Sequence, residues 1–156
     1  MNNLSFHITD ITANSIRANA SEIGLSVEEQ DTRIVIRITD NGLGMDAETA
    51  RRVTNPFYTT RTTRKVGLGL PFLIQNAEQT GGSVPLTSEP GKGTEVRAVF
   101  HSDHIDCPPW GDLPGTVALL ITGNPEINVC FEYRSGETGY SISTNEIKEI
   151  LDGVPL

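Results

Sequence analysis

Two polar side chains one helical turn apart lie near the start of the chain. Asp10 and Asn14 stand four residues apart in a segment with the apolar spacing of a helix, so both fall on one helical face. An amide oxygen is a ligand for Mg²⁺, and a carboxylate within about 3 Å of a water can take its proton. A solvated helix surface uses the same pair of residues, so this motif alone leaves both interpretations open.

A second carboxylate follows an alternating apolar segment and precedes two glycines. Asp40, Gly42 and Gly44 form an Asp-x-Gly-x-Gly pattern at the end of the expected strand. A buried carboxylate is the natural acceptor for the N6 amino group of adenine, and glycines let a backbone approach a flat ring closely. A plain tight turn is the alternative interpretation of this motif.

A third motif combines glycines with the start of a helix. The sequence Gly67-Leu68-Gly69-Leu70 opens a segment with helical spacing. The free N–H groups at a helix start, together with the helix dipole, favour a bound phosphate. A lone glycine pair at a helix start is also common without any ligand, so the motif needs support from its neighbours.

The loop before these glycines is basic. Residues 59–66 are rich in threonine and carry Arg61, Arg64 and Lys65, in a chain whose net charge is -8. Such side chains can screen the phosphates of a nucleotide, and we assign Lys65 to the terminal phosphate. The alternative is an ordinary solvated surface loop.

The composition argues against several classes of protein. The 156 residues include 12 Lys+Arg against 20 Asp+Glu, which argues against nucleic acid as the main partner. No apolar run approaches the roughly 18 residues that span a bilayer, and residues 1–5 lack the pattern of a secretion signal. The two cysteines, Cys107 and Cys130, cannot form a disulfide framework. We therefore expect a reduced, cytoplasmic protein without a membrane partner.

The elements that must position these motifs alternate between helices and strands. Apolar spacing of the helical kind predicts helices over residues 4–23, 47–53, 68–80 and 143–152, the last from a capping box of Ser143 and Glu146. Alternating or continuous apolar runs predict strands over residues 26–30, 33–39, 83–87, 94–100, 116–122, 128–134 and 140–143. Short turns imply mostly antiparallel pairs, so the predicted class is α+β, with helices on one face of a mixed sheet.

The order and spacing of the motifs resemble one known superfamily. The polar helix, the Asp-x-Gly-x-Gly strand end, the Gly-Leu-Gly-Leu helix start and the turn Gly91–Thr94 resemble the N, G1, G2 and G3 boxes of the GHKL superfamily. DNA gyrase B, Hsp90, histidine kinases and MutL belong to it, and the chain is most similar to a stand-alone histidine kinase-like ATPase domain. The resemblance covers roughly residues 4–100 and implies the Bergerat fold, a two-layer α/β sandwich, with a mobile lid over residues 59–66.

The resemblance also implies a role for each matching residue, with ATP as the ligand. Asp10 would orient the attacking water or acceptor hydroxyl, and Asn14 would hold Mg²⁺. Asp40 would bind adenine, with Thr94 supporting its carboxylate. The remaining nucleotide contacts are implied for Arg17, Gly42, Gly44, Met45, Arg61, Lys65, Gly67, Leu68, Gly69 and Leu70.

On this basis residues 1–101 are predicted to form the ATP-binding domain, and residues 102–156 a C-terminal extension of strands and a helix packed on it. We expect a Mg²⁺-dependent ATPase, or a kinase that transfers phosphate to Ser or His of a partner protein. The alternative is a nucleotide-sensing module that binds ATP or ADP, performs no chemistry and regulates a partner. A homodimer is a further alternative for its assembly.

Two histidine-containing segments fit the resemblance less well. His7 lies on the same helical stripe as Asp10, where a supporting or surface role is favoured over a phosphoacceptor. Most ATP-hydrolysing relatives carry Glu in place of Asp10, so the shorter side chain predicts slow turnover. Zinc could be bound by the side chains of His101, His104 and Cys107. Their Pro-flanked connector has no fourth ligand nearby in sequence, which favours the interpretation that these residues bind no metal.

Overall fold

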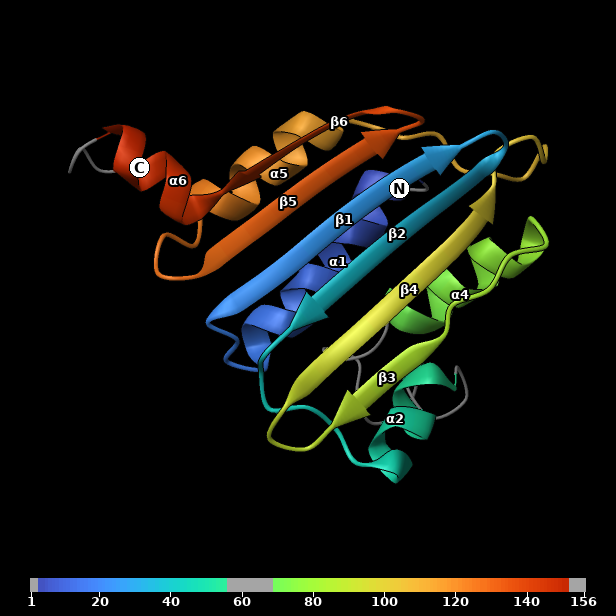
Figure 1. The fold of residues 1–156 in the computed structure, drawn as a ribbon. Coiled ribbons are helices and arrows are strands. Elements are labelled where there is room, and N and C mark those ends of the chain that lie inside the picture. Colours follow the sequence, from blue (N-terminus) through green and yellow to red (C-terminus); the bar gives the residue numbers. More distant parts are fainter. Residues whose placement is uncertain (1–2, 56–68, 152–156) are drawn as a thin grey trace.

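The computed structural model of the chain describes residues 3–55 and 69–151. Within this part a six-stranded mixed sheet has the order β3-β4-β2-β1-β5-β6 (Figure 1). All neighbouring strands are antiparallel except β1 and β5, which are parallel. The strands are β1 (Glu22–Gln30), β2 (Arg33–Asp40), β3 (Leu86–Glu89), β4 (Gly93–His101), β5 (Asn128–Ser135) and β6 (Thr138–Ser143).

Helices form a second layer behind this sheet. The central helix α1 packs between α4 and α5, and Figure 1 shows all three on the same face of the sheet. The helices are α1 (Leu4–Arg17), α2 (Ala47–Thr54), α4 (Gly69–Gln79), α5 (Leu113–Thr122) and α6 (Thr144–Leu151). The α+β class, with helices on one face of a mixed sheet, is as predicted. None of the described helices combines the length and apolarity needed to cross a membrane.

The strand alternation explains why one face of the sheet is covered. In β1 the residues Ile23, Leu25 and Val27 are buried, whereas Glu22 and Glu28 are exposed. The strand β2 buries Ile34, Ile36 and Ile38 in the same way and packs against α1. The period-2 pattern therefore directs one apolar face toward the helices, while the opposite face is mainly polar but also contains the buried pair Val35 and Val99. At Asp31, φ is 54°, which places the hairpin turn where the sequence predicts it.

The first helix is shorter than predicted. The Asn3 side chain caps it by accepting from the Phe6 N–H at 2.7 Å, and Leu4, Ile8 and Ile11 form its buried stripe. It ends at Arg17 instead of residue 23, because Asn19 adopts a left-handed φ of 63°. The expected end of the helix belongs to β1, which begins at Glu22 instead of residue 26.

The prediction of a strand over residues 116–122 is wrong, because this segment lies in helix α5. Asp112 caps the helix by accepting from the Gly115 N–H at 3.0 Å, and Pro114 occupies its first turn. The helix buries Val117, Leu120 and Ile121, which is the i, i+3, i+4 spacing of one helical face. The run Thr-Val-Ala-Leu-Leu-Ile-Thr is apolar throughout, so its periodicity does not separate a helix from a strand.

Smaller differences affect two other predicted elements. The strand predicted over residues 83–87 is present only from Leu86, and Ser83 forms an isolated bridge to Val99. At the last helix the Glu146 N–H donates to Ser143 Oγ at 3.2 Å, which is one of the two hydrogen bonds of the predicted capping box. Boundaries are set by hydrogen bonds between segments, which a local pattern does not contain.

The connector between β4 and α5 forms hydrogen bonds with helix α1 and with strand β1. The N–H groups of Leu4 and Ser5 donate to the carbonyls of Pro109 and Trp110 at 2.8 and 3.0 Å. These bonds satisfy two of the free donors at the start of α1. The Trp110 Nε1–H donates to Glu29 Oε1 at 3.0 Å, and Tyr133 donates to the other oxygen of Glu29. Residues after 101 therefore contact α1 and β1 directly, while the division at residue 101 stays a prediction.

Candidate functional site

A pocket of about 200 Å³ opens between α1, α2, α4 and the ends of β2 and β4. Most of its wall is apolar, and its polar groups come from α1 and from the strand ends. This combination of an apolar wall with a few converging polar atoms is typical of a small-molecule site. The lining residues are Ile11, Asn14, Ser15, Arg17, Ala18, Ile38, Asp40, Gly44, Met45, Val53, Leu70, Thr94 and Val96.

The carboxylate of Asp40 is fixed in this pocket by two donors. Ser15 Oγ donates to Asp40 Oδ2 at 2.6 Å, and the Gly42 N–H donates to Oδ1 at 2.9 Å. A carboxylate oxygen accepts more than one hydrogen bond, so each oxygen retains capacity for a ligand donor. Because Asp40 is only half-buried, a ligand in the pocket can reach this carboxylate.

The glycines after Asp40 are required by close contacts within the protein. A Cβ at Gly42 would lie 2.7 Å from the Ala18 carbonyl oxygen at the end of α1. Gly44 has a φ of 71°, and a Cβ there would overlap the Glu89 carbonyl. The glycines thus press the segment after β2 against α1 and against the β3–β4 turn, and this packing places Gly44 in the pocket wall.

Hydroxyl groups join the other strand end to the same segment. Thr94 lies opposite Asp40 in the β2–β4 register, and its Oγ1 is 2.8 Å from Ser88 Oγ. Ser88 Oγ in turn accepts from the Met45 N–H at 2.8 Å. Ser15 is the hydroxyl donor to Asp40, whereas Thr94 supports this wall of the pocket through Ser88.

Two polar residues of α1 lie at the rim of the pocket. The Arg17 guanidinium donates to Asn14 Oδ1, the atom expected to face a metal. Both side chains line the pocket, and Arg17 is exposed. An amide oxygen has two lone pairs, so Asn14 Oδ1 can accept a second partner while Arg17 occupies the first position.

The predicted catalytic acid lies against the first residue of α4. A Cβ at Gly69 would be 2.9 Å from Asp10 Cβ and 3.4 Å from Asp10 Oδ2. Burial raises the pKa of Asp10 above its usual value, and the nearby charge of Arg17 opposes this shift. The carboxylate of Asp10 therefore lies beside the helix start at which phosphates were expected.

Comparison with known proteins identifies the family to which the chain belongs. Residues 3–104 match the family described as histidine kinase-, DNA gyrase B- and HSP90-like ATPase. The chain belongs to this family. At the level of the family, it is an ATPase-type domain of the kind that binds ATP or ADP, generally with Mg²⁺.

Individual relatives of this ATPase domain include bacterial kinases. It is 29% identical over 104 residues to the sensor histidine kinase YxdK of Bacillus subtilis, covering 62% of this chain and 32% of that protein. It is 30% identical over 101 residues to sporulation kinase C of the same organism, covering 64% of this chain and 23% of that protein. The chain thus matches about a third or less of the length of these relatives.

Solved structures show the same fold. The Aquifex aeolicus MutL ATPase domain, complexed with ADP, superposes with a TM-score of 0.53 at 16% identity, covering 97% of this chain and 70% of that one. The N-terminal domain of a DNA repair protein superposes with a TM-score of 0.57 at 19% identity, covering 90% of this chain and 51% of that one. The Bergerat architecture predicted for the chain is confirmed.

The structure brings most of the described candidate residues of the ATPase domain to one place. Seven of them line the pocket: Asn14, Arg17, Asp40, Gly44, Met45, Leu70 and Thr94. Asp10 and Gly69 contact each other at its α4 side, and Gly42 packs against α1. Four candidates, Arg61, Lys65, Gly67 and Leu68, lie outside the described residues, so their phosphate contacts stay predictions. The same holds for the lid expected over residues 59–66.

Sequence reasoning missed Ser15 as a partner of Asp40. The signal was present, because Ser15 continues the apolar stripe of Leu4, Ile8 and Ile11 on α1. A buried polar residue in such a stripe needs a hydrogen-bond partner. The apolar lining residues Val53 and Val96 were not predicted either. Only their burial in the folded chain identifies them as pocket residues, and burial depends on the complete fold.

His7 is buried between α1 and α4. Its Nε2 is 2.7 Å from Asn76 Nδ2, and its ring lies 5.1 Å from that of Phe72. Desolvation lowers the pKa of His7 to about 4, so the imidazole is neutral near pH 7. Its Nδ1 has no hydrogen-bond partner among the described residues. Of the two roles predicted for His7, a supporting or a surface one, its burial agrees with the supporting role and excludes the surface one.

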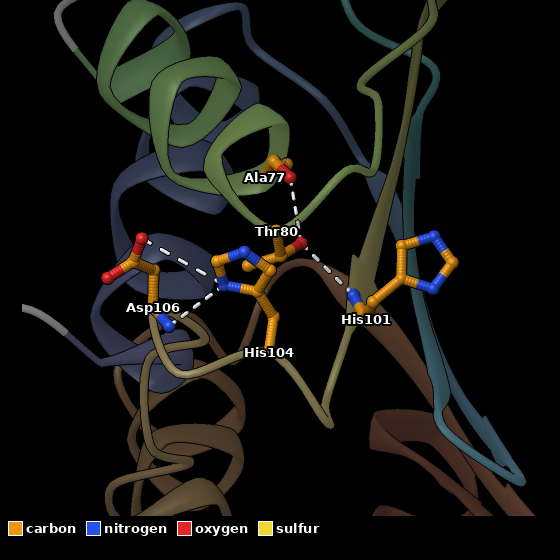
Figure 2. A network of polar contacts seen from close by, with 5 residues as sticks. All are labelled: Ala77, Thr80, His101, His104 and Asp106. Atoms are coloured by element: carbon orange, nitrogen blue, oxygen red, sulfur yellow. Dashed lines mark hydrogen bonds and ion pairs between the residues drawn. The ribbon is translucent and has the colours of Figure 1, made fainter.

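The histidines of the connector do not converge. In Figure 2 the rings of His101 and His104 point in different directions, and the His101 N–H donates to Thr80 Oγ1 at 3.0 Å. His104 Nδ1 accepts from the Asp106 N–H at 3.0 Å. Within residues 3–55 and 69–151, no three His, Cys, Asp or Glu residues are arranged to hold a metal.

Proposed function

We propose that this chain binds ATP in the pocket between α1, α4 and the sheet, with the Asp40 carboxylate accepting a hydrogen bond from the adenine N6 amino group. The observation that carries the proposal is the fixed position of Asp40 in a pocket with a mostly apolar wall. Ser15 and Gly42 fix the carboxylate by hydrogen bonds. The side chains of Ile38, Met45 and Leu70 line the pocket and can pack against an aromatic base.

The carboxylate gives a physical reason for choosing adenine over guanine. Adenine presents an N–H donor at position 6, whereas guanine presents a carbonyl oxygen there. An oxygen facing the Asp40 carboxylate would replace a hydrogen bond to a charged group, worth about 1.5 to 3 kcal/mol, by two opposed acceptors in a desolvated site. The preference for adenine nucleotides is therefore expected to be at least about tenfold.

The phosphates are proposed to reach the start of α4, where free N–H groups and the helix dipole favour an anion. Asp10 already lies against Gly69 at this point, so phosphates and carboxylate would repel each other without a cation. The amide oxygen of Asn14 suits Mg²⁺, which would neutralise the phosphate charge when bound. Arg17 would then exchange its bond with Asn14 for one with a phosphate oxygen.

Asp10 is proposed as the residue that accepts the proton in the reaction. A water or a protein hydroxyl would form a new bond to the γ-phosphorus while the bond from that phosphorus to ADP breaks. The proton of the attacking oxygen would pass to the Asp10 carboxylate. Its raised pKa makes Asp10 a stronger base than an ordinary aspartate. The kinase relatives support a partner protein as acceptor, with hydrolysis as the reaction when water replaces it.

One contact favours a second function, the nucleotide-sensing module. The bond from Arg17 places a positive charge at Asn14 Oδ1, the proposed metal ligand, where it would repel Mg²⁺. If this pair persisted with nucleotide bound, the chain would bind without chemistry. Phosphate release that follows Mg²⁺ concentration supports the catalytic proposal, and tight binding without release supports the sensor.

The experiment that tests the binding proposal is calorimetric titration of the chain with ATP and GTP in the presence of Mg²⁺. ATP is expected to bind at least about tenfold more tightly than GTP, because of the donor at position 6. Equal affinity for both nucleotides would contradict the assignment of Asp40 to the base. No heat from either nucleotide would contradict the proposed site as a whole.

A further inference from the structure

The two edges of the described sheet are built differently. At one edge, β3 has four residues, follows Pro85 and has helix α2 packed against it. These features limit the access of another strand, because an edge is protected by shortness, proline or a covering element. Figure 1 shows α2 next to β3, while β6 is the outermost strand at the opposite edge.

Within the described residues, the other edge is longer and lacks a proline, and helix α6, which follows directly in the chain, contacts β6 and β5. The strand β6 (Thr138–Ser143) contains neither a charged residue nor a proline, although the chain as a whole has a net charge of -8. Its register with β5 runs without interruption from Ser135–Thr138 to Cys130–Ser143, so no bulge bends it away. Its first four residues are exposed. An open, neutral and regular edge of this kind is a template for another strand.

We propose that β6 pairs antiparallel with β6 of a second copy of this chain, so that the two sheets join into one. A two-fold axis perpendicular to the sheet keeps both helix layers on the same side. With the axis at Ser141, Gly139 lies opposite Ser143 of the copy on the polar face. On the helix side, Tyr140 lies opposite Ile142 of the copy.

Charge and side-chain size favour the second copy as the occupant of this edge. All six strand residues are neutral, so self-pairing brings no like charges together within the strand. The small residues of the polar face allow close approach of the two backbones.

An exposed aromatic ring gives a second reason to expect that β6 pairs with another copy of the chain. Tyr140 is 57% exposed, and its ring packs on Phe131 and Tyr133 with centroid distances of 5.9 and 5.6 Å. Pairing would add the copy's Ile142 to this cluster and bury part of the exposed ring. Aromatic and β-branched residues form favourable cross-strand pairs of this kind.

The test compares a lysine at each edge of the sheet. Ser141→Lys places a charge on the polar face of β6, beside Glu132 of β5. Thr87→Lys is the matched control, because it places the same charge on the same face of β3, beside Glu95 of β4. Sedimentation velocity from micromolar to near-millimolar protein should show a dimer for the unchanged chain and for Thr87→Lys, but a monomer for Ser141→Lys. A monomeric unchanged chain, or a dimeric Ser141→Lys variant, would overturn the proposal.

Cross-linking gives a readout that does not depend on disrupting the strand. In a Cys107→Ser, Cys130→Ser background, Ser141→Cys should form a disulfide-linked dimer on mild oxidation, because opposed residues of antiparallel strands lie within disulfide reach. Thr87→Cys in the same background should not. Equal cross-linking at both positions, or none at residue 141, would contradict the pairing. ATP affinity should be unchanged in both lysine variants, so this result is separate from the proposed nucleotide site.

Discussion

The pocket beside α1 and the connector after β4 both contain polar residues at suggestive spacing, yet they differ in the structure. The pocket draws Asp40 from a strand end, Asn14 from a helix and Thr94 from a neighbouring strand. The connector places His101 at the end of β4 and His104 in a turn, with their rings pointing apart. Only the first set converges on a common space.

The difference shows what makes a motif informative. A strand end and a helix face have fixed directions, so residues on them can be placed relative to one another before the fold is known. Residues of an irregular connector have no such direction, and their spacing does not define a geometry. The following experiments test whether the pocket is functional and whether the connector is only structural.

The largest change is expected at the proposed catalytic residue of the pocket. Asp10→Asn keeps the size of the side chain but removes the proton acceptor, so phosphate release should fall by about 100-fold or more. ATP affinity, measured by calorimetry, should change little. Asp103→Asn in the connector is the control and should keep full activity. Unchanged phosphate release in Asp10→Asn would favour the nucleotide-sensing module.

A buried and an exposed histidine provide a comparison of stability. The pKa of His7 is about 4 in the folded chain and about 6.5 when unfolded, so the unfolded state binds the proton more readily. The contribution of His7 to the free energy of unfolding is complete above about pH 6.5 and is lost as the pH falls toward 4. This loss amounts to about 2 kcal/mol between pH 7 and pH 5. Urea unfolding at both pH values should show this loss.

The matched variants separate His7 from the other titrating groups. His7→Gln should abolish this part of the pH dependence, whereas His104→Gln in the exposed connector should retain it. If both variants lose stability on acidification as the unchanged chain does, the buried histidine is not its source. This would contradict a tightly packed interface between α1 and α4.

A smaller effect is expected from the residue that holds Asp40. Ser15→Ala removes the 2.6 Å hydrogen bond to Oδ2 and leaves the carboxylate less well oriented. A hydrogen bond to a charged group contributes about 1.5 to 3 kcal/mol, so ATP affinity should fall about tenfold. Ser26→Ala, on the polar face of the sheet, should leave affinity unchanged. Equal affinity in Ser15→Ala would show that Gly42 alone orients Asp40.

The smallest effect is expected in the connector. His104→Ala should change the free energy of unfolding by less than about 0.5 kcal/mol, because the ring is exposed and forms only local contacts. Zinc or a chelator should not shift the melting temperature of the unchanged chain. Zinc stabilisation that disappears in His104→Ala would make the connector a metal site and remove the contrast between the two regions.

The sequence was sufficient for the fold class and for the region of the site. The alternation of Ile34, Ile36 and Ile38 defined a strand with one buried face, and the motif order located its end beside a polar helix. The match of residues 3–104 to the ATPase family agrees with this interpretation. These features are local, so a reading of neighbouring residues detects them.

The features that the sequence did not reveal depend on contacts between distant segments. The strand expected over residues 116–122 is helix α5, and the Asp112 cap with Pro114 was the local sign that outweighed the β-branched residues. The bond between Ser15 and Asp40 joins residues 25 positions apart, and the reason for glycine at 42 is the end of α1. Such contacts become visible only when the elements are packed.

The most direct test of the account is the affinity for ATP of Asp40→Asn compared with Asp31→Asn. Both variants remove one carboxylate, and asparagine tolerates the left-handed backbone of residue 31. Calorimetry with Mg²⁺ and ATP should show that the affinity for ATP falls at least about tenfold in Asp40→Asn and does not change in Asp31→Asn. Equal affinity in the two variants would contradict the claim that Asp40 recognises the adenine base.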